Sequence, residues 1–170
     1  SALLHEYSSQ PSEPEYKVYT PPVSRPREMR RSKAAPKPLT LIERIAEMIE
    51  EERYDQASEE LTRLVAAEPE NAVAKYYLGM LHFNQGEFAA ATDHFEASLK
   101  IKPDNFDACF FAGSSYLNRQ MLAQAEQHFE QALKIKDDAF ARINLADIYI
   151  RTSRPGESEK MYQSVIKANP

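Results

Sequence analysis

Residues 78–82 read Leu-Gly-Met-Leu-His, and this stretch decides the fold because its pattern returns at a fixed interval. Residues 112–116 (Ala-Gly-Ser-Ser-Tyr) follow 34 residues later, and residues 145–149 (Leu-Ala-Asp-Ile-Tyr) follow after a further 33. A second pattern, Ala-x-x-x-Phe at 91–95, returns as Ala-x-x-x-Phe at 125–129 and as Ser-x-x-x-Tyr at 158–162. A period of this length indicates a solenoid, in which each unit buries its apolar side chains only against its neighbours.

Each unit reads as two amphipathic helices joined by a short turn. In the best-defined unit we expect helices over about 72–85 and 88–101, with Gly86 ending the first and Pro103 breaking the chain after the second. Pro155 is expected to begin the second helix of the last unit. The predicted fold is all-α, a right-handed α-solenoid of about four helix-turn-helix repeats. The expected repeats are about 39–71, 72–105, 106–138 and 139–170.

Residues 1–38 lie outside the repeats and are expected to form an extended or disordered arm. The arm holds 7 of the 11 prolines and no glycine, so it cannot bury enough apolar surface to fold alone. Its net charge is +3, whereas residues 39–170 carry −8. The arm is then either a solvated linker or a basic segment that docks on an acidic surface. Nucleic acid is not expected as a partner, because the acidic repeats would repel phosphate.

These repeated residues resemble the tetratricopeptide repeat family over about 39–170. The family pattern is Leu-Gly-x-x-Tyr on the first helix, Ala-x-x-x-Phe on the second and a closing proline. The chain departs from it at His82, which replaces the tyrosine, and at Asp137, which replaces the proline. The glutamate-rich first unit is expected to cap the array. The resemblance implies a scaffold that binds other proteins, although the matching residues are those that pack.

In such an array the first helices are expected to line a concave groove. The predicted inward stripe is more apolar than a solvated groove needs to be, which is typical of an interaction site. The alternative is that several of these residues belong to the core. The predicted partner-binding residues are Tyr76, Met80, Phe83, Asn84, Phe110, Ser114, Leu117, Asn118, Phe140, Ile143, Asp147 and Arg151.

Two features of this stripe bear on what the partner is. Asn84 and Asn118 are equivalent, and an amide can both donate to and accept from a peptide backbone. Some family members clamp a C-terminal carboxylate with inward basic residues, but those places here hold Ile42, Tyr76 and Phe110. The sequence therefore predicts a peptide segment or partner subunit, and it predicts against a chaperone-tail clamp.

The ends of the chain offer surfaces for self-association. Tyr16, Tyr19 and the prolines of the arm could anchor it in a groove of a neighbouring copy or of another subunit. At the other end, Ile148, Tyr162 and Ile166 are expected to be partly uncovered, because no further helix follows in this sequence. Since the chain starts at Ser1 rather than Met, we expect a cut fragment or a processed chain.

No catalytic or cofactor-binding motif is found. His94 and His128 are equivalent residues of successive repeats, and neither forms a His-x-x-x-His or Cys-His pair in the sequence of the kind that a metal site uses. His82 is expected to fill a packing place, and Cys109 is expected to be a small buried hydrophobe. We expect no enzyme, no metal and no cofactor. No apolar run is long enough to span a membrane, and the expected location is cytoplasmic.

The sequence thus predicts a protein-interaction scaffold or adaptor that holds a peptide segment or a partner subunit within a larger assembly. The alternative is the regulatory or oligomerising array of a larger multidomain signalling enzyme, with residues 1–38 as the interdomain linker.

Overall fold

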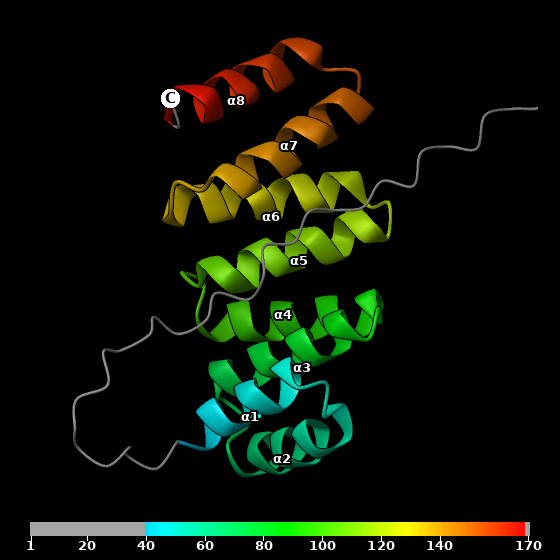
Figure 1. The fold of residues 1–170 in the computed structure, drawn as a ribbon, viewed down its shortest axis with the longest axis vertical. Helices are drawn as coiled ribbons and strands as arrows, with labels where there is room; N and C mark the ends of the chain where they lie inside the picture. The colour runs from blue at the N-terminus through cyan, green and yellow to red at the C-terminus, as the bar shows by residue number, and fades with distance from the viewer. Residues whose placement is uncertain (1–39, 169–170) are drawn as a thin grey trace, which may run out of the picture.

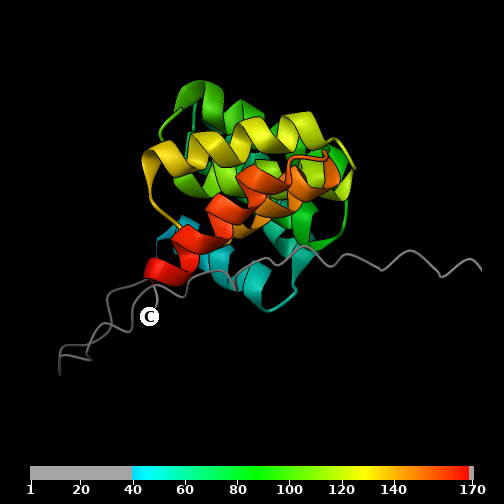
Figure 2. The same cartoon turned by 90° about the horizontal axis from the view of Figure 1, so that it is seen from above.

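The structure is a computed structural model that describes residues 40–168; the predicted arm over 1–38, Leu39 and residues 169–170 lie outside it. Within the described range all regular secondary structure is helical, and the helices stack in pairs from α1 and α2 at one end to α7 and α8 at the other (Figure 1). Figure 2 shows the same stack end on, with α7 and α8 over the earlier pairs. The helices are α1 (Leu41–Glu50), α2 (Tyr54–Ala67), α3 (Ala72–Asn84), α4 (Phe88–Ile101), α5 (Phe106–Asn118), α6 (Leu122–Ile135), α7 (Ala139–Arg151) and α8 (Pro155–Ala168).

The expected architecture, a right-handed α-solenoid of four helix pairs, is confirmed. The prediction of helices over 72–85 and 88–101 agrees with α3 and α4 to within one residue. Pro155 begins α8, as predicted. Consecutive pairs also pack on one another, because α4 contacts α5 and α6 contacts α7.

The first helix of every pair is capped at its N-terminus by a side chain. Asn71 and Asn105 accept from the backbone N–H of Ala74 and Ala108 at 2.9 and 3.2 Å. Asp138 caps α7 in the same way, and Thr40 forms a reciprocal capping box with Glu43 at α1. Such a cap stabilises a helix by about 1 kcal/mol. The second helices α2, α4 and α6 have no side-chain cap, so the caps mark where each repeat begins.

The turn inside each pair has the same backbone form four times. Gly86 has a φ of 77°, and the equivalent residues Glu52, Gln120 and Ser153 have φ of 59–60°. In each turn the following N–H donates to a carbonyl five residues back, as from Glu87 to His82 at 2.8 Å. This left-handed turn favours glycine, yet the chain places glycine in one of the four.

Close packing within the pairs depends on a glycine facing an aromatic ring. A Cβ built on Gly79 would lie 2.6 Å from the Phe95 ring, so nothing larger than glycine fits without movement. Ser98 adds a hydrogen bond from its hydroxyl to the Ala72 carbonyl at 2.7 Å, which joins the far ends of α3 and α4. The small residues Gly79 and Ser98 thus let the two helices approach closely.

The buried side chains form two clusters that divide at α3. The cluster of the first repeat is small and aliphatic, and it includes Ile45, Leu61 and Leu78. The larger cluster runs from Met80 to Tyr149 and contains three buried aromatic rings from successive helices, Phe95, Phe111 and Phe129. One side of α3 therefore packs on the first repeat, and another side packs on the rest of the array.

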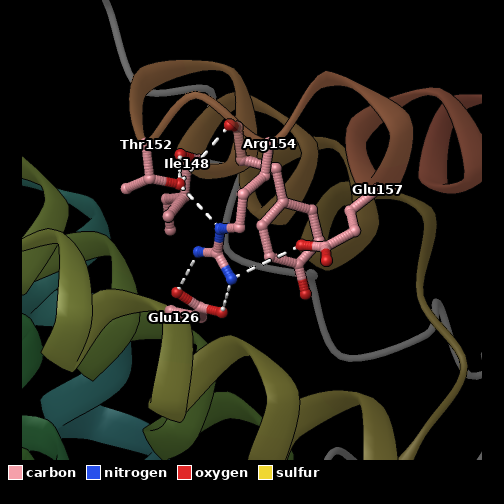
Figure 3. Close-up of polar contacts among 6 residues, drawn as sticks. Glu126, Ile148, Thr152, Arg154 and Glu157 are labelled. Atoms are coloured by element: carbon pink, nitrogen blue, oxygen red, sulfur yellow. Dashed lines mark hydrogen bonds and ion pairs between the residues drawn. The ribbon is translucent and has the colours of Figure 1, made fainter.

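An arginine joins the last pair to the pair before it (Figure 3). The Arg154 guanidinium lies between α7 and α8 and donates to both carboxylate oxygens of Glu126 on α6, at 2.8 and 2.5 Å. Its Nε donates to the Thr152 hydroxyl at 3.0 Å, and that hydroxyl donates to the Ile148 carbonyl at 2.8 Å. The bidentate pair ties the turn between α7 and α8 to α6.

Candidate protein-binding face

The first helices of the pairs present a common face, which we call the A-helix face. Its helices are α1, α3, α5 and α7; α1 packs against α3, and α3 packs against α5. All of the predicted partner-binding residues lie on these helices. The structure divides them into a buried set and an accessible set.

Four of the predicted residues are buried, so the expectation that they line an exposed groove is wrong. Met80, Phe110 and Leu117 are each 2 % exposed, and Ser114 is fully buried. Phe110 packs edge to face on Phe129, with ring centroids 5.5 Å apart. The Ser114 hydroxyl donates to the Phe110 carbonyl at 3.0 Å within its own helix. For the three residues of α5 the cause is the central place of this helix, which packs against α3, α4 and α6. Met80 lies on the side of α3 that packs on the large cluster.

The accessible set is still apolar for a protein surface. Val73 on α3 is 44 % exposed and Ile150 on α7 is 50 % exposed. Four of the predicted partner-binding residues lie between Val73 and Ile150 in the sequence and are half-buried: Tyr76, Phe83, Phe140 and Ile143. Large apolar side chains that remain accessible over several neighbouring helices are typical of a protein-interaction surface.

The two asparagines of the predicted stripe differ in what they can offer. Asn84 is exposed at the C-terminal end of α3. Asn118 is half-buried, and its amide nitrogen donates to the Ser114 carbonyl at 2.9 Å. The structure thus leaves Asn84 accessible to a peptide backbone, whereas one donor of Asn118 is already used within its own helix.

Asp147 and Arg151 lie together on α7. Their charged groups are 3.8 Å apart, and Arg151 also donates to the side-chain oxygen of Gln120 from the preceding repeat. Partial burial raises the pKa of Asp147, against the lowering effect of Arg151. A carboxylate in this position is poorly solvated, so a donor from a partner would stabilise it.

Tyr77 is a part of this face that the sequence reasoning missed. It is half-buried beside Tyr76, with ring centroids 5.2 Å apart. Burial raises the pKa of Tyr77, and the charges of Asp107, Glu50 and Glu43 raise it further. α3 packs against both α1 and α5, so carboxylates of both helices act on the pKa of this phenol. The repeat pattern does not show that α1 packs against α3, so it gives no signal for Tyr77.

The histidines are explained by packing between helices. The His82 and His94 rings stack with centroids 5.1 Å apart, and His82 Nδ1 lies 2.6 Å from a Glu87 carboxylate oxygen. His82 is half-buried rather than part of the core, which corrects the expectation for it. His128 repeats the arrangement by stacking on Tyr116 at 5.4 Å.

Polar groups between α4, α5 and α6 form a network around Tyr116. Its hydroxyl donates a hydrogen bond to the Glu96 carboxylate. Burial is the largest cause that raises the pKa of Tyr116 to about 12, and this hydrogen bond is the second. Arg119 lies over the same ring and donates to the Thr92 hydroxyl at 2.8 Å. These groups are paired with one another, so we interpret them as structural contacts between helices and not as a catalytic site.

Over residues 40–168, no cluster of three or more His, Cys, Asp or Glu side chains could hold a metal ion.

Cys109 is fully buried, as predicted, and burial raises the pKa of its thiol to about 11.

At the end of the array, Tyr162 and Ile166 are 37 and 69 % exposed, which confirms the uncovered surface expected there. The same expectation for Ile148 is wrong, because that side chain is fully buried. It points into the large cluster together with Leu145 and Tyr149.

Comparison with known families identifies the class of this chain. Three models of the tetratricopeptide repeat match it, over residues 49–106, 83–142 and 141–170. The matches together span 49–170, and the chain belongs to the tetratricopeptide repeat family. No curated protein matches the sequence. In the described part of the chain, no helix has the length and apolar character needed to cross a membrane.

Solved structures with the same fold include two of MamA and one of a peptide complex. A crystal structure of MamA has a TM-score of 0.71 at 21% identity, covering 75% of this chain and 75% of that one. MamA 41-end from Desulfovibrio magneticus RS-1 has a TM-score of 0.68 at 15% identity, covering 75% and 72%. The first tetratricopeptide repeat domain of Spaghetti (RPAP3), bound to the HSP90 peptide SRMEEVD, has a TM-score of 0.64 at 21% identity, covering 66% and 90%. At these identities the likeness establishes the fold.

Proposed function

We propose that this chain is a protein-interaction scaffold that holds an extended or helical segment of a partner along its A-helix face. The observation that carries the proposal is that Val73 on α3 and Ile150 on α7 are exposed apolar side chains on first helices, where neither is needed for the core. The fold supports the same role, because a neighbour of the same architecture, RPAP3, binds a peptide. The role is binding rather than catalysis.

The charges on the A-helix face indicate which kind of partner segment it would bind. The HSP90 peptide in the RPAP3 complex, SRMEEVD, carries three acidic residues. In this chain Glu43 and Glu50 on α1 and Asp107 on α5 are exposed on helices that pack against α3, and they would repel such a peptide. Phe110 is buried, and it holds a place at which some family members carry a carboxylate-binding side chain. We therefore expect a partner segment with apolar anchors and without an acidic end.

Matched substitutions of exposed aliphatic residues test the proposal. Val73→Glu combined with Ile150→Glu places charge on the A-helix face, and both side chains are exposed, so the fold should be kept. Ile135→Glu is the control, because Ile135 is 38 % exposed on α6, a second helix. Each immobilised full-length chain is used to capture proteins from native lysate, with circular dichroism to check the fold.

The expected result is that the chain and Ile135→Glu capture the same identified protein, and that the A-helix-face variant loses it at least tenfold. Such a loss corresponds to about 1.4 kcal/mol of binding free energy. Equal capture by all three chains would contradict a binding role for this face.

A further inference from the structure

The acidic charge of the array is concentrated in its first repeat. Residues 40–71 hold 3 arginines and 10 Asp or Glu residues, a net charge of −7. Residues 72–168 hold 11 basic and 12 acidic residues, a net charge of −1. An electrostatic partner of this chain would therefore be drawn to one end of the stack rather than to its whole length.

Within this end, the carboxylates meet an accessible apolar surface at Tyr77. The ring packs on the small cluster of the first repeat. Its helix α3 packs against α1, which carries the exposed Glu43 and Glu50, and against α5, which carries the exposed Asp107. Ile42 and Tyr76 are half-buried on the same helices. The surface thus combines an aromatic ring, aliphatic side chains and three negative charges.

The later repeats show which group completes this combination. Arg119 lies 5.5 Å from the Tyr116 ring centroid, whose hydroxyl is bonded to Glu96. Arg154 lies 4.5 Å from the Tyr149 ring centroid and is paired with Glu126. Both sites combine a tyrosine, a carboxylate and an arginine, at the place in the repeat that His82 holds in α3. They show that this chain pairs arginine with tyrosine and carboxylate, and Tyr77 lies at a different place in the repeat. Among residues 40–168, no lysine or arginine lies over the ring of Tyr77.

The sequence supplies such arginines directly before the first repeat. Residues 25–37 contain six basic residues and one acidic residue, Glu28. Lys37 is three residues from Thr40, which caps α1. An extended chain spans about 3.3 Å per residue, so Arg30 can reach roughly 33 Å from Thr40. That reach exceeds the length of α1, which at 10 residues is about 15 Å.

We propose that residues 25–37 of the same chain bind the first-repeat end of the A-helix face, with an arginine over Tyr77 and among Glu43, Glu50 and Asp107. The proposal rests on the proposed function, because it assigns an internal occupant to one end of the face that would hold the partner. The covalent link favours binding within one chain, since a short flexible tether gives an effective concentration of the order of millimolar. Arginine adds a cation–π contact to the ionic attraction.

The test is paramagnetic relaxation enhancement on the isotope-labelled full-length chain, with a nitroxide at Ser32→Cys. Cys109 is fully buried, so it is left unlabelled at neutral pH. At low salt the label should broaden amide resonances of α1 and of α3 around Tyr77, and leave those of α6 and α8 unchanged. At high salt the broadening should decrease severalfold, because screening weakens attraction between accessible charges.

Charge variants of the array give a matched comparison. Glu43→Gln, Glu50→Gln and Asp107→Asn together should remove the broadening. The same loss of three charges on second helices, Glu59→Gln, Glu60→Gln and Glu130→Gln, should leave it in place. Retained broadening in the first variant, or its loss in both, would overturn the proposed site.

A mixed sample separates this arrangement from binding between chains. Spin-labelled chains without isotope are mixed with isotope-labelled chains without a spin label, and no broadening is expected. Broadening that arises in the mixture, or none in the singly labelled chain, would overturn an occupant from the same chain. The readout does not depend on partner capture, so failure here leaves the proposed function standing, and failure of capture leaves this test unaffected.

Discussion

In the third repeat ten consecutive residues of α5, from Ala108 to Leu117, are buried, whereas α1 of the first repeat buries only Ile45 and Ile49. Both helices are the first of a two-helix unit, each has a side-chain N-cap, and each is followed by the same turn. The difference comes from position, because α5 packs against α3, α4 and α6, and α1 packs against α2 and α3. In a solenoid the internal repeats therefore carry the shared core, and the end repeats keep surface for other contacts.

The largest expected effects on stability come from truncating one buried side chain in each of the two clusters. Phe129→Ala should destabilise the whole array by about 3–5 kcal/mol, because the ring is fully buried in the large cluster. Leu61→Ala should cost about 2–5 kcal/mol in the first repeat, and hydrogen exchange should show faster opening of α1 and α2 only. If Leu61→Ala speeds exchange equally in α5 and α6, the two clusters unfold as one unit and the comparison between repeats fails.

A smaller contrast is expected at the glycines that face aromatic rings. A Cβ on Gly79 would lie 2.6 Å from Phe95, and one on Gly113 would lie 3.1 Å from Phe129. Gly79→Ala should destabilise by about 1–3 kcal/mol, because a buried ring must move. Gly113→Ala should be close to neutral, since the gain of about 1 kcal/mol in helix propensity offsets a milder contact. Chemical denaturation measures both, and equal losses would show that the two repeats pack alike.

The pH dependence of stability should reflect two histidines of the middle repeats. Burial lowers the pKa of His94, with a further contribution from His82, and burial lowers that of His128, against the effect of Glu96. The unfolded chain then takes up protons first as the pH falls below about 6.5. Stability should decrease from pH 7 toward pH 5, since the unfolded state binds more protons in that window.

The double variant His94→Gln plus His128→Gln isolates this effect, because the carboxylates titrate alike in both chains. Urea midpoints measured across the window should fall less steeply for the variant than for the unchanged chain. Parallel slopes would mean that the histidines do not couple folding to protons.

The smallest effect is expected at the uncovered end. Ile166 is 69 % exposed on α8, so Ile166→Ala should change the free energy of unfolding by less than about 0.5 kcal/mol. Thermal unfolding at several protein concentrations provides the measurement. A larger loss that grows with protein concentration would show that this end is covered in solution.

The helices and their order could be predicted from the sequence, because the small residues and aromatic rings recur at a fixed interval. The extent to which α5 is buried could not be predicted from that interval, because the interval is the same for every first helix. A signal for it was nevertheless present: residues 108–117 contain no charged side chain on any side of the helix. A helix that is apolar or small all round is buried all round.

Two further features depend on the assembled structure. The left-handed turn residue is glycine at Gly86 but not in the other three turns, where it is Glu52, Gln120 or Ser153. In those three turns only the repeat spacing indicates the left-handed residue. The carboxylates around Tyr77 come from helices before and after it in the chain. Their proximity follows from the packing of α3 between α1 and α5.

The most direct test of a binding role for the A-helix face is site-specific photo-crosslinking of the full-length chain in native lysate. A photoreactive residue replaces Ile150 on α7 or Ile135 on α6, which are exposed to 50 and 38 %. The account predicts one specific crosslinked protein from position 150 and its absence from position 135. The same crosslinked product from both positions, or a product from position 135 alone, would contradict it.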